Sequence, residues 1–313
     1  MSNSQTFTFI QHNLSCVEYY ESLGKSAKVI SSKDTFRDIN TYLQKNKADL
    51  YTLQNVENKT NSNNGVVPSQ SKTFKFEYNN IKKETYYIGD SDETVNIKNG
   101  CAVVYDSNIF NLVESYDLNF YFPVLCDFAS PLVHLEVNKS KEYLFVLSVD
   151  SIKPYPITLQ RSNKIKKIVD SLIKMLETFN RIFTKEQIEF SFIIGGDFKM
   201  NLYEPNLDDF KSSSVKKKEA KKIIDDSIKK LFNTFEKLDI EYDLDDSIDT
   251  VYTGDDQNNY HNCNDFIFKS KYLETEKIQY GCNHQGSLPE WQDLNEFNTD
   301  FQHKSITCMF SSN

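Results

Sequence analysis

Apolar and polar residues alternate in several short stretches of the chain, and apolar residues recur with a helical period in three longer ones. Alternation is typical of a strand with one buried face, and it occurs within residues 6–14, 73–116, 132–137 and 142–149. The helical period runs through residues 32–47, 157–184 and 215–238. Because strands outnumber helices, the pattern predicts a four-layer α/β sandwich: two mixed or antiparallel sheets packed face to face, with helices outside.

One apolar run is continuous instead of alternating. It begins at Phe190 and stops at Gly195 and Gly196, which are followed by Asp197. Such a run is typical of a strand buried on both faces, and the paired glycines indicate that the backbone turns tightly there. We therefore expect this strand to deliver the carboxylate of Asp197 to an edge of its sheet. The helical stretch before it predicts a β-α-β crossover.

Composition and charge narrow the class of protein. A chain of 313 residues that is 39% hydrophobic can bury a large core, and we expect one domain over residues 1–313, with polar loops at 58–72 and 201–214. Acidic residues outnumber basic ones by 45 to 36, and the net charge of −9 disfavours nucleic acid as a partner. The six cysteines show no C-x-x-C spacing, which argues against a zinc site.

The hydropathy of the chain shows whether a signal peptide or a membrane-spanning helix is expected. Residues 1–13 contain neither the basic nor the apolar region of a signal peptide. No stretch approaches the roughly 18 consecutive apolar residues that a membrane-spanning helix needs. We expect a soluble, intracellular protein without a membrane span; the sequence does not indicate a compartment.

Six stretches, taken in chain order, carry short motifs with polar residues at strand ends. They are TFTFIQHN (6–13), ADLYTLQNVE (48–57), YLFVLSVDSIKP (143–154), FIIGGDFK (192–199), CNDFIFKS (263–270) and FNTDFQHKSITCMF (297–310). In order and spacing they resemble the endonuclease/exonuclease/phosphatase superfamily, the DNase I-like phosphodiesterases, over essentially the whole chain. The resemblance implies a DNase I-like fold for the predicted sandwich. It also implies metal-dependent hydrolysis of phosphoric esters, if the site is complete.

Four residues match positions of the family's catalytic site: Asn13, Asp197, Asp265 and His303. By resemblance, Asn13 reaches the metal and the phosphate. Asp265 orients the catalytic His303, and we expect these two side chains to lie within hydrogen-bond reach of each other. A plain alternative is that Asp265 and His303 are only a hydrogen-bonded pair retained from a shared core.

Four other positions depart from the family pattern. Asn55 stands in place of the metal-binding Glu, Gln302 in place of an Asp, Lys199 in place of an Asn and Asp150 in place of a His. Mg²⁺ is held mainly through carboxylate oxygens, so the first two changes remove ligand charge. Lys199 lies two residues after Asp197 and therefore on the same face, where its ammonium group could occupy the cation's place.

The residues leave three hypotheses open. The first is a catalytically inactive protein with vestigial site residues and no metal, acting as a binding or scaffold subunit with a protein partner. The second is a divergent Mg²⁺-dependent phosphodiesterase (a nuclease, a deadenylase, or an inositol or sphingolipid phosphodiesterase) with Asp197, Glu57 and Asp300 as metal ligands. The third is a metal-free hydrolase that uses His303 and Asp265 as acid and base. Carboxylates of Glu57 and Asp300 near Asp197 would favour the second hypothesis, and a Lys199–Asp197 contact would disfavour it.

Overall fold

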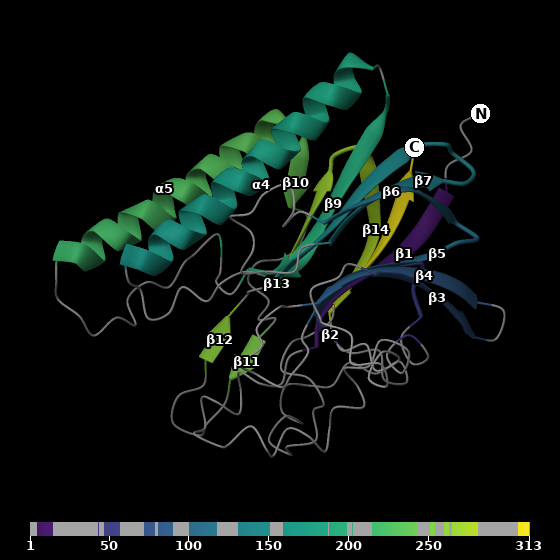
Figure 1. The fold of residues 1–313 in the computed structure, drawn as a ribbon, viewed down its shortest axis with the longest axis horizontal. Coiled ribbons are helices and arrows are strands. Elements are labelled where there is room, and N and C mark those ends of the chain that lie inside the picture. The colour runs from purple at the N-terminus through teal and green to yellow at the C-terminus, as the bar shows by residue number, and fades with distance from the viewer. Residues whose placement is uncertain are drawn as a thin grey trace.

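Apolar strands determine the architecture, which we describe from a computed structural model of the chain. The structure describes residues 5–14, 43, 47–56, 72–78, 81–89, 100–117, 131–150, 159–186, 188–198, 202, 215–242, 251–253, 260–262, 265–280 and 306–312. Within these residues, nearly all strands belong to two mixed sheets, and two long helices lie against one of them (Figure 1).

The larger sheet has seven strands in the order β14-β15-β1-β2-β5-β4-β3. Its strands are β1 (Gln5–Asn13), β2 (Leu50–Val56), β3 (Lys72–Tyr78), β4 (Ile81–Gly89), β5 (Gly100–Asp106), β14 (Leu273–Tyr280) and β15 (Ile306–Ser312). The strand β1 pairs parallel with β2 and antiparallel with β15, so the first described strand lies in the interior of the sheet.

The smaller sheet has six strands in the order β10-β13-β9-β8-β7-β6. Its strands are β6 (Phe110–Asp117), β7 (Pro131–Val137), β8 (Tyr143–Asp150), β9 (Phe190–Asp197), β10 (Ile240–Tyr242) and β13 (Asp265–Ser270). Two short strands, β11 (Val251–Thr253) and β12 (Tyr260–Asn262), pair with each other. Within the smaller sheet, β8 and β9 pair in parallel. The helix between them in the chain, at Leu159–Lys185, makes the predicted β-α-β crossover.

The two sheets pack face to face around an apolar core. Phe7 and Phe9 of β1 contact this core together with Val133, Val146 and Ile193 of the smaller sheet. Burying one such side chain fully stabilises the folded state by about 1.5–3 kcal/mol. The alternation that predicts strands in the sequence is thus the pattern that brings the inner faces of the two sheets together.

Helices α4 (Leu159–Lys185) and α5 (Val215–Lys237) lie side by side and cover the outer face of the smaller sheet (Figure 1). Their apolar stripes make a second core with the outer residues of β8, β9 and β13. Lys230 of α5 donates to Asp170 of α4 at 2.6 Å, which links the two helices on their solvent side. Such a half-exposed pair contributes less than about 1 kcal/mol, so the apolar contacts hold the helices in place.

The architecture confirms the predicted fold class: two mixed sheets packed face to face with helices on the outside. The hairpin predicted at 132–149 is confirmed as β7 and β8. The helices predicted at 157–184 and 215–238 agree with α4 and α5 to within two residues at each end. No helix in the described part of the chain combines the length and apolar character that crossing a membrane requires.

The tight turn predicted at Gly195 and Gly196 is wrong. The strand β9 continues through both glycines to Asp197, and neither glycine has a φ in the left-handed region. A Cβ on Gly195 would collide with Thr52 Oγ1 of the opposite sheet, and a Cβ on Gly196 would collide with the Val149 carbonyl. The glycines therefore mark a close approach of neighbouring backbone and side chains, not a change of chain direction.

Other predictions concern segments that lie outside the described residues. They include the helix at 32–47, apart from Leu43 and Lys47, and the polar loops at 58–72 and 201–214, apart from Lys72 and Leu202. The expectation of one domain over residues 1–313 also stays a prediction.

Candidate functional site

Three aspartates lie in register on adjacent strands of the smaller sheet. Asp150 of β8 is the register partner of Asp197 of β9, and Asp197 is the register partner of Asp265 of β13. Register partners on neighbouring strands have Cα atoms about 5 Å apart and side chains on the same face. Asp150, Asp197 and Asp265 therefore form one row, which we call the carboxylate row, at the end of the sheet where β8 and β9 finish.

Asn13 reaches the carboxylate row from the opposite sheet. It is the last residue of β1, and its Nδ2 donates to Asp197 Oδ2 at 2.5 Å. Both side chains are fully buried. A hydrogen bond to an ionised group contributes about 1.5–3 kcal/mol, and a buried carboxylate without such donors is costly. This contact brings together two of the four matching residues, one from each sheet.

Asp265 accepts a hydrogen bond from Gln11, also on β1. Gln11 Nε2 lies 3.1 Å from Asp265 Oδ1 and 2.9 Å from Gln54 Oε1. Gln54 Nε2 in turn donates to Ser148 Oγ at 2.9 Å, and Ser148 Oγ donates to the Leu53 carbonyl at 3.1 Å. We call Gln11, Gln54 and Ser148 the amide chain. It joins three strands of the two sheets directly beneath the carboxylate row.

The amide chain is the part of the site that sequence reasoning missed. All three of its side chains are completely buried. The available signal was the presence of long amides, Gln11 and Gln54, near the ends of two strands. Buried amides need partners, so such residues are expected to bond with one another or with buried acids.

The structure does not describe several of the predicted site residues. His303, Gln302, Lys199, Glu57 and Asp300 lie outside the described residues, so their predicted contacts with Asp265 and Asp197 stay predictions. The backbone of Asn55 lies in β2, one residue after Gln54.

The described residues do not by themselves make a site for a divalent cation. Among them, no three Asp, Glu, His or Cys side chains lie where they could hold one metal ion together. In the row, Asp197 accepts from Asn13 and Asp265 accepts from Gln11.

Several solved structures share this architecture at low sequence identity. Compared over 99% of this chain and 96% of theirs, a structure of ANGEL2, described as a 2',3'-cyclic phosphatase, has a TM-score of 0.57 at 13% identity. An AP endonuclease from Leishmania major has a TM-score of 0.55 at 12% identity, covering 99% of this chain and 89% of that one. An endonuclease/exonuclease/phosphatase family protein from Bacteroides thetaiotaomicron has a TM-score of 0.53 at 13% identity, with 99% of each chain covered.

In sequence, no protein-family model and no curated protein matches the chain. The structural likeness extends over nearly the full length of both chains, which confirms the predicted fold. The chain has the DNase I-like fold of the endonuclease/exonuclease/phosphatase proteins. At 12–13% identity the structural likeness establishes the fold of the chain but not its activity. Any activity has to be argued from the residues of the site.

Proposed function

We propose that this chain uses the DNase I-like fold as a binding or scaffold subunit and does not carry out cation-dependent hydrolysis of phosphoric esters. The observation that carries the proposal is that Asp197 and Asp265 each accept a hydrogen bond from a neutral amide of the opposite sheet. In this role the acids hold the two sheets together at their shared edge. Asn55 supports the same role, because an amide in β2 adds no charge for a cation.

The proposal explains how the edge is stable without a cation. Buried carboxylates are costly unless donors surround them, and amides from β1 supply such donors with good geometry. The amide chain fixes Gln11 in turn, because its Nε2 also bonds to Gln54. By this reasoning the edge is a structural clamp, and the fold serves to present a surface to a protein partner.

Titration calorimetry with Mg²⁺ or Mn²⁺, together with an assay on bis(p-nitrophenyl) phosphate, tests the proposal. We expect no saturable heat and no hydrolysis above buffer. Restoring Asn55→Glu, Lys199→Asn and Gln302→Asp together is expected to recover cation binding, whereas each single change is not, because metal ligands act as a set. The triple variant thereby shows that a silent wild-type result reflects the ligand set and not a misfolded sample.

The scaffold role needs its own measurement, because an inactive site alone does not make a protein a scaffold. We expect the protein to migrate with a larger mass in its native extract than when purified. Migration as a lone monomer under both conditions would contradict the scaffold role.

A second candidate is a divergent Mg²⁺-dependent phosphodiesterase, and the carboxylate row is the observation that favours it. Three acids in register on adjacent strands repel one another, and a divalent cation is one way to relieve that repulsion. A bound Mg²⁺ would polarise a phosphoryl oxygen and activate water. Saturable Mg²⁺ binding by the unmodified protein, lost on Glu57→Ala or Asp300→Ala, would replace the scaffold proposal with this one.

A further inference from the structure

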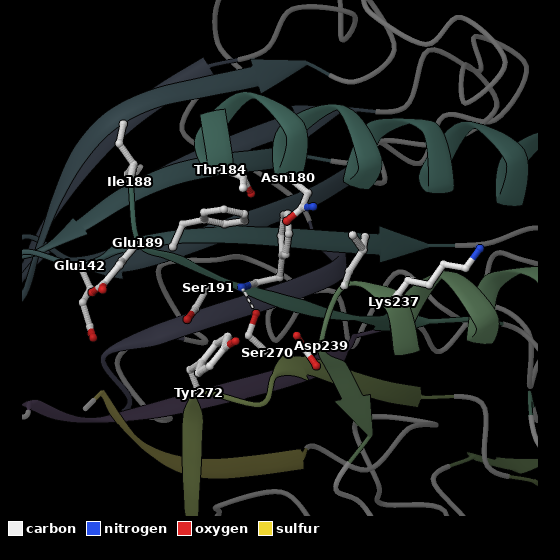
Figure 2. Close-up of a pocket in the computed structure, with 13 residues that line it drawn as sticks. Glu142, Asn180, Thr184, Ile188, Glu189, Ser191, Lys237, Asp239, Ser270 and Tyr272 are labelled. Atoms are coloured by element: carbon white, nitrogen blue, oxygen red, sulfur yellow. Dashed lines mark hydrogen bonds between the residues drawn. The ribbon is translucent and has the colours of Figure 1, made fainter. Parts of the chain in front are cut away.

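A groove of about 590 Å³ opens at the end of the smaller sheet opposite to the carboxylate row (Figure 2). It lies where β8 and β9 begin and where α4 and α5 end. Its volume falls within the roughly 300–1,000 Å³ that is usual for ligand sites. Since β9 has eight residues, the groove and the carboxylate row are separated by about 23 Å along this strand.

The groove is negatively charged. Its lining includes three carboxylates, of Glu142, Glu189 and Asp239, against one ammonium group, of Lys237, which gives a formal charge of −2. Asp239 also has Lys271 as a partner at 3.4 Å, a distance at which a half-exposed pair is weak. The carboxyl ends of α4 and α5 add partial negative charge, because their last carbonyls point along the helix axes. The groove therefore favours a cationic ligand.

Aromatic side chains supply the apolar part of the groove. Phe190, which is half-buried, lines it, and Tyr272 stands at its rim with 64% of its surface exposed (Figure 2). A guanidinium group stacks favourably on aromatic faces, and its apolar stem can lie along them. An arginine side chain can pair with the carboxylates and stack on the aromatic rings at the same time. A small inorganic cation would interact with the carboxylates alone.

A buried hydroxyl adds a polar contact within the groove. Ser270 is only 4% exposed, and its Oγ accepts a hydrogen bond from the Phe192 backbone N–H at 2.8 Å (Figure 2). A hydroxyl oxygen has two acceptor lone pairs, so a second N–H donor can bond to it. Arginine, with five N–H donors in a fixed plane, can contact this oxygen and a carboxylate together.

We propose that this groove docks an arginine side chain carried by a segment of a partner protein. A peptide suits the site better than a free amine because Glu189, Lys237, Asp239 and Tyr272 are exposed along its rim, where a passing chain can contact them. The net charge of −9 also steers a basic partner toward the protein. The inference does not depend on whether the carboxylate row is catalytic.

Backbone-amide NMR during titration with the peptide acetyl-Gly-Arg-Leu-Arg-Gly-amide tests the proposal on the full chain. We expect saturable shifts at the amides of Ser270 and Tyr272, and none with the matched Gly-Glu-Leu-Glu-Gly peptide. The groove variant combines Glu142→Gln, Glu189→Gln and Asp239→Asn. Asn is chosen because the residue has a φ of 52°, a conformation that Asn tolerates.

A control variant makes the same change of charge elsewhere: Glu219→Gln, Asp225→Asn and Asp226→Asn, all exposed on α5 away from the groove. The groove variant should weaken peptide binding by at least about tenfold, since three charge contacts of up to about 1 kcal/mol each are lost. The control should stay within about twofold of wild type by the same reasoning. Tyr272→Ala should also weaken binding, without changing the net charge.

Three results would overturn the proposal. Equal weakening by the groove and control variants would mean that only net charge attracts the peptide. An absence of saturable shifts at Ser270 and Tyr272 would mean that the peptide does not enter the groove. Binding of free arginine amide as tight as that of the peptide would assign the groove to a small amine and not to a partner protein. The carboxylate row is not probed by this experiment. None of these results therefore bears on whether the protein binds a cation or hydrolyses phosphoric esters.

Discussion

Protonation of His134 should destabilise the fold at acidic pH. This histidine lies on β7, is only 5% exposed, and stacks on Phe145 with ring centroids 4.4 Å apart. The rings of Tyr143 and Phe183 also contact it, and no described residue forms a hydrogen bond with its Nε2. Burial lowers the pKa of His134 to about 4, with nearby Glu114 opposing the shift.

The sign and the size of the effect follow from the two states of the chain. In the unfolded chain the pKa is about 6.5, so between pH 6.5 and 4 the unfolded state binds a proton that the folded state excludes. Stability therefore falls as the pH decreases through this window. The difference of about 2.5 pKa units corresponds to about 3 kcal/mol, since each unit is worth about 1.4 kcal/mol.

Urea unfolding at a series of pH values, on wild type and on His134→Phe, measures this contribution. Phenylalanine has a similar shape, can keep the ring contacts, and does not titrate. We expect the wild type to lose about 3 kcal/mol more than the variant between pH 7.5 and 4. All other acids and histidines are common to both proteins, so the difference isolates His134. Parallel stability curves would refute the reasoning.

Two further predictions concern the contact between the sheets. Gly195→Ala should lower the free energy of unfolding by about 1–3 kcal/mol, because the new methyl group would overlap Thr52 Oγ1 of the opposite sheet. A thermal midpoint equal to that of wild type would contradict this, because it would mean that the two sheets can move apart at this point without loss of stability. Gln54→Leu should lower the free energy of unfolding by about 1–3 kcal/mol, because it removes the partner of both Gln11 and Ser148. In chemical denaturation, a stability equal to wild type would mean that water replaces the lost bonds.

The sequence was sufficient to predict the sheets and the position of Asp197 at the end of its strand. Both predictions depend on local information: the alternation along each strand, and the placement of a polar residue after an apolar run. Asp265 and Asp197 are register partners because two such strands lie side by side. The order of the strands within each sheet was not predicted, because alternation does not determine it.

The amide chain and the reason for the paired glycines could not be predicted in this way. Gln11 and Asp265 are 254 residues apart in sequence, so their hydrogen bond depends on how the two sheets pack. A glycine pair after an apolar run has the same local pattern whether the backbone turns or another group comes close. Only the position of Thr52, on a strand of the other sheet, decides between these two uses of Gly195.

The place of β1 in its sheet has a consequence for folding during synthesis. Gln5 of β1 pairs with Ser312 of β15, so one side of β1 stays unpaired until the much later strand β15 has been synthesised. Contacts of such long range slow folding, and unpaired strand edges favour aggregation in the meantime. The pairing of β1 with β2 can form much earlier, which leaves the opposite edge of β1 unpaired until β15 has been synthesised. We therefore expect the chain to be most prone to aggregate while β15 is still missing.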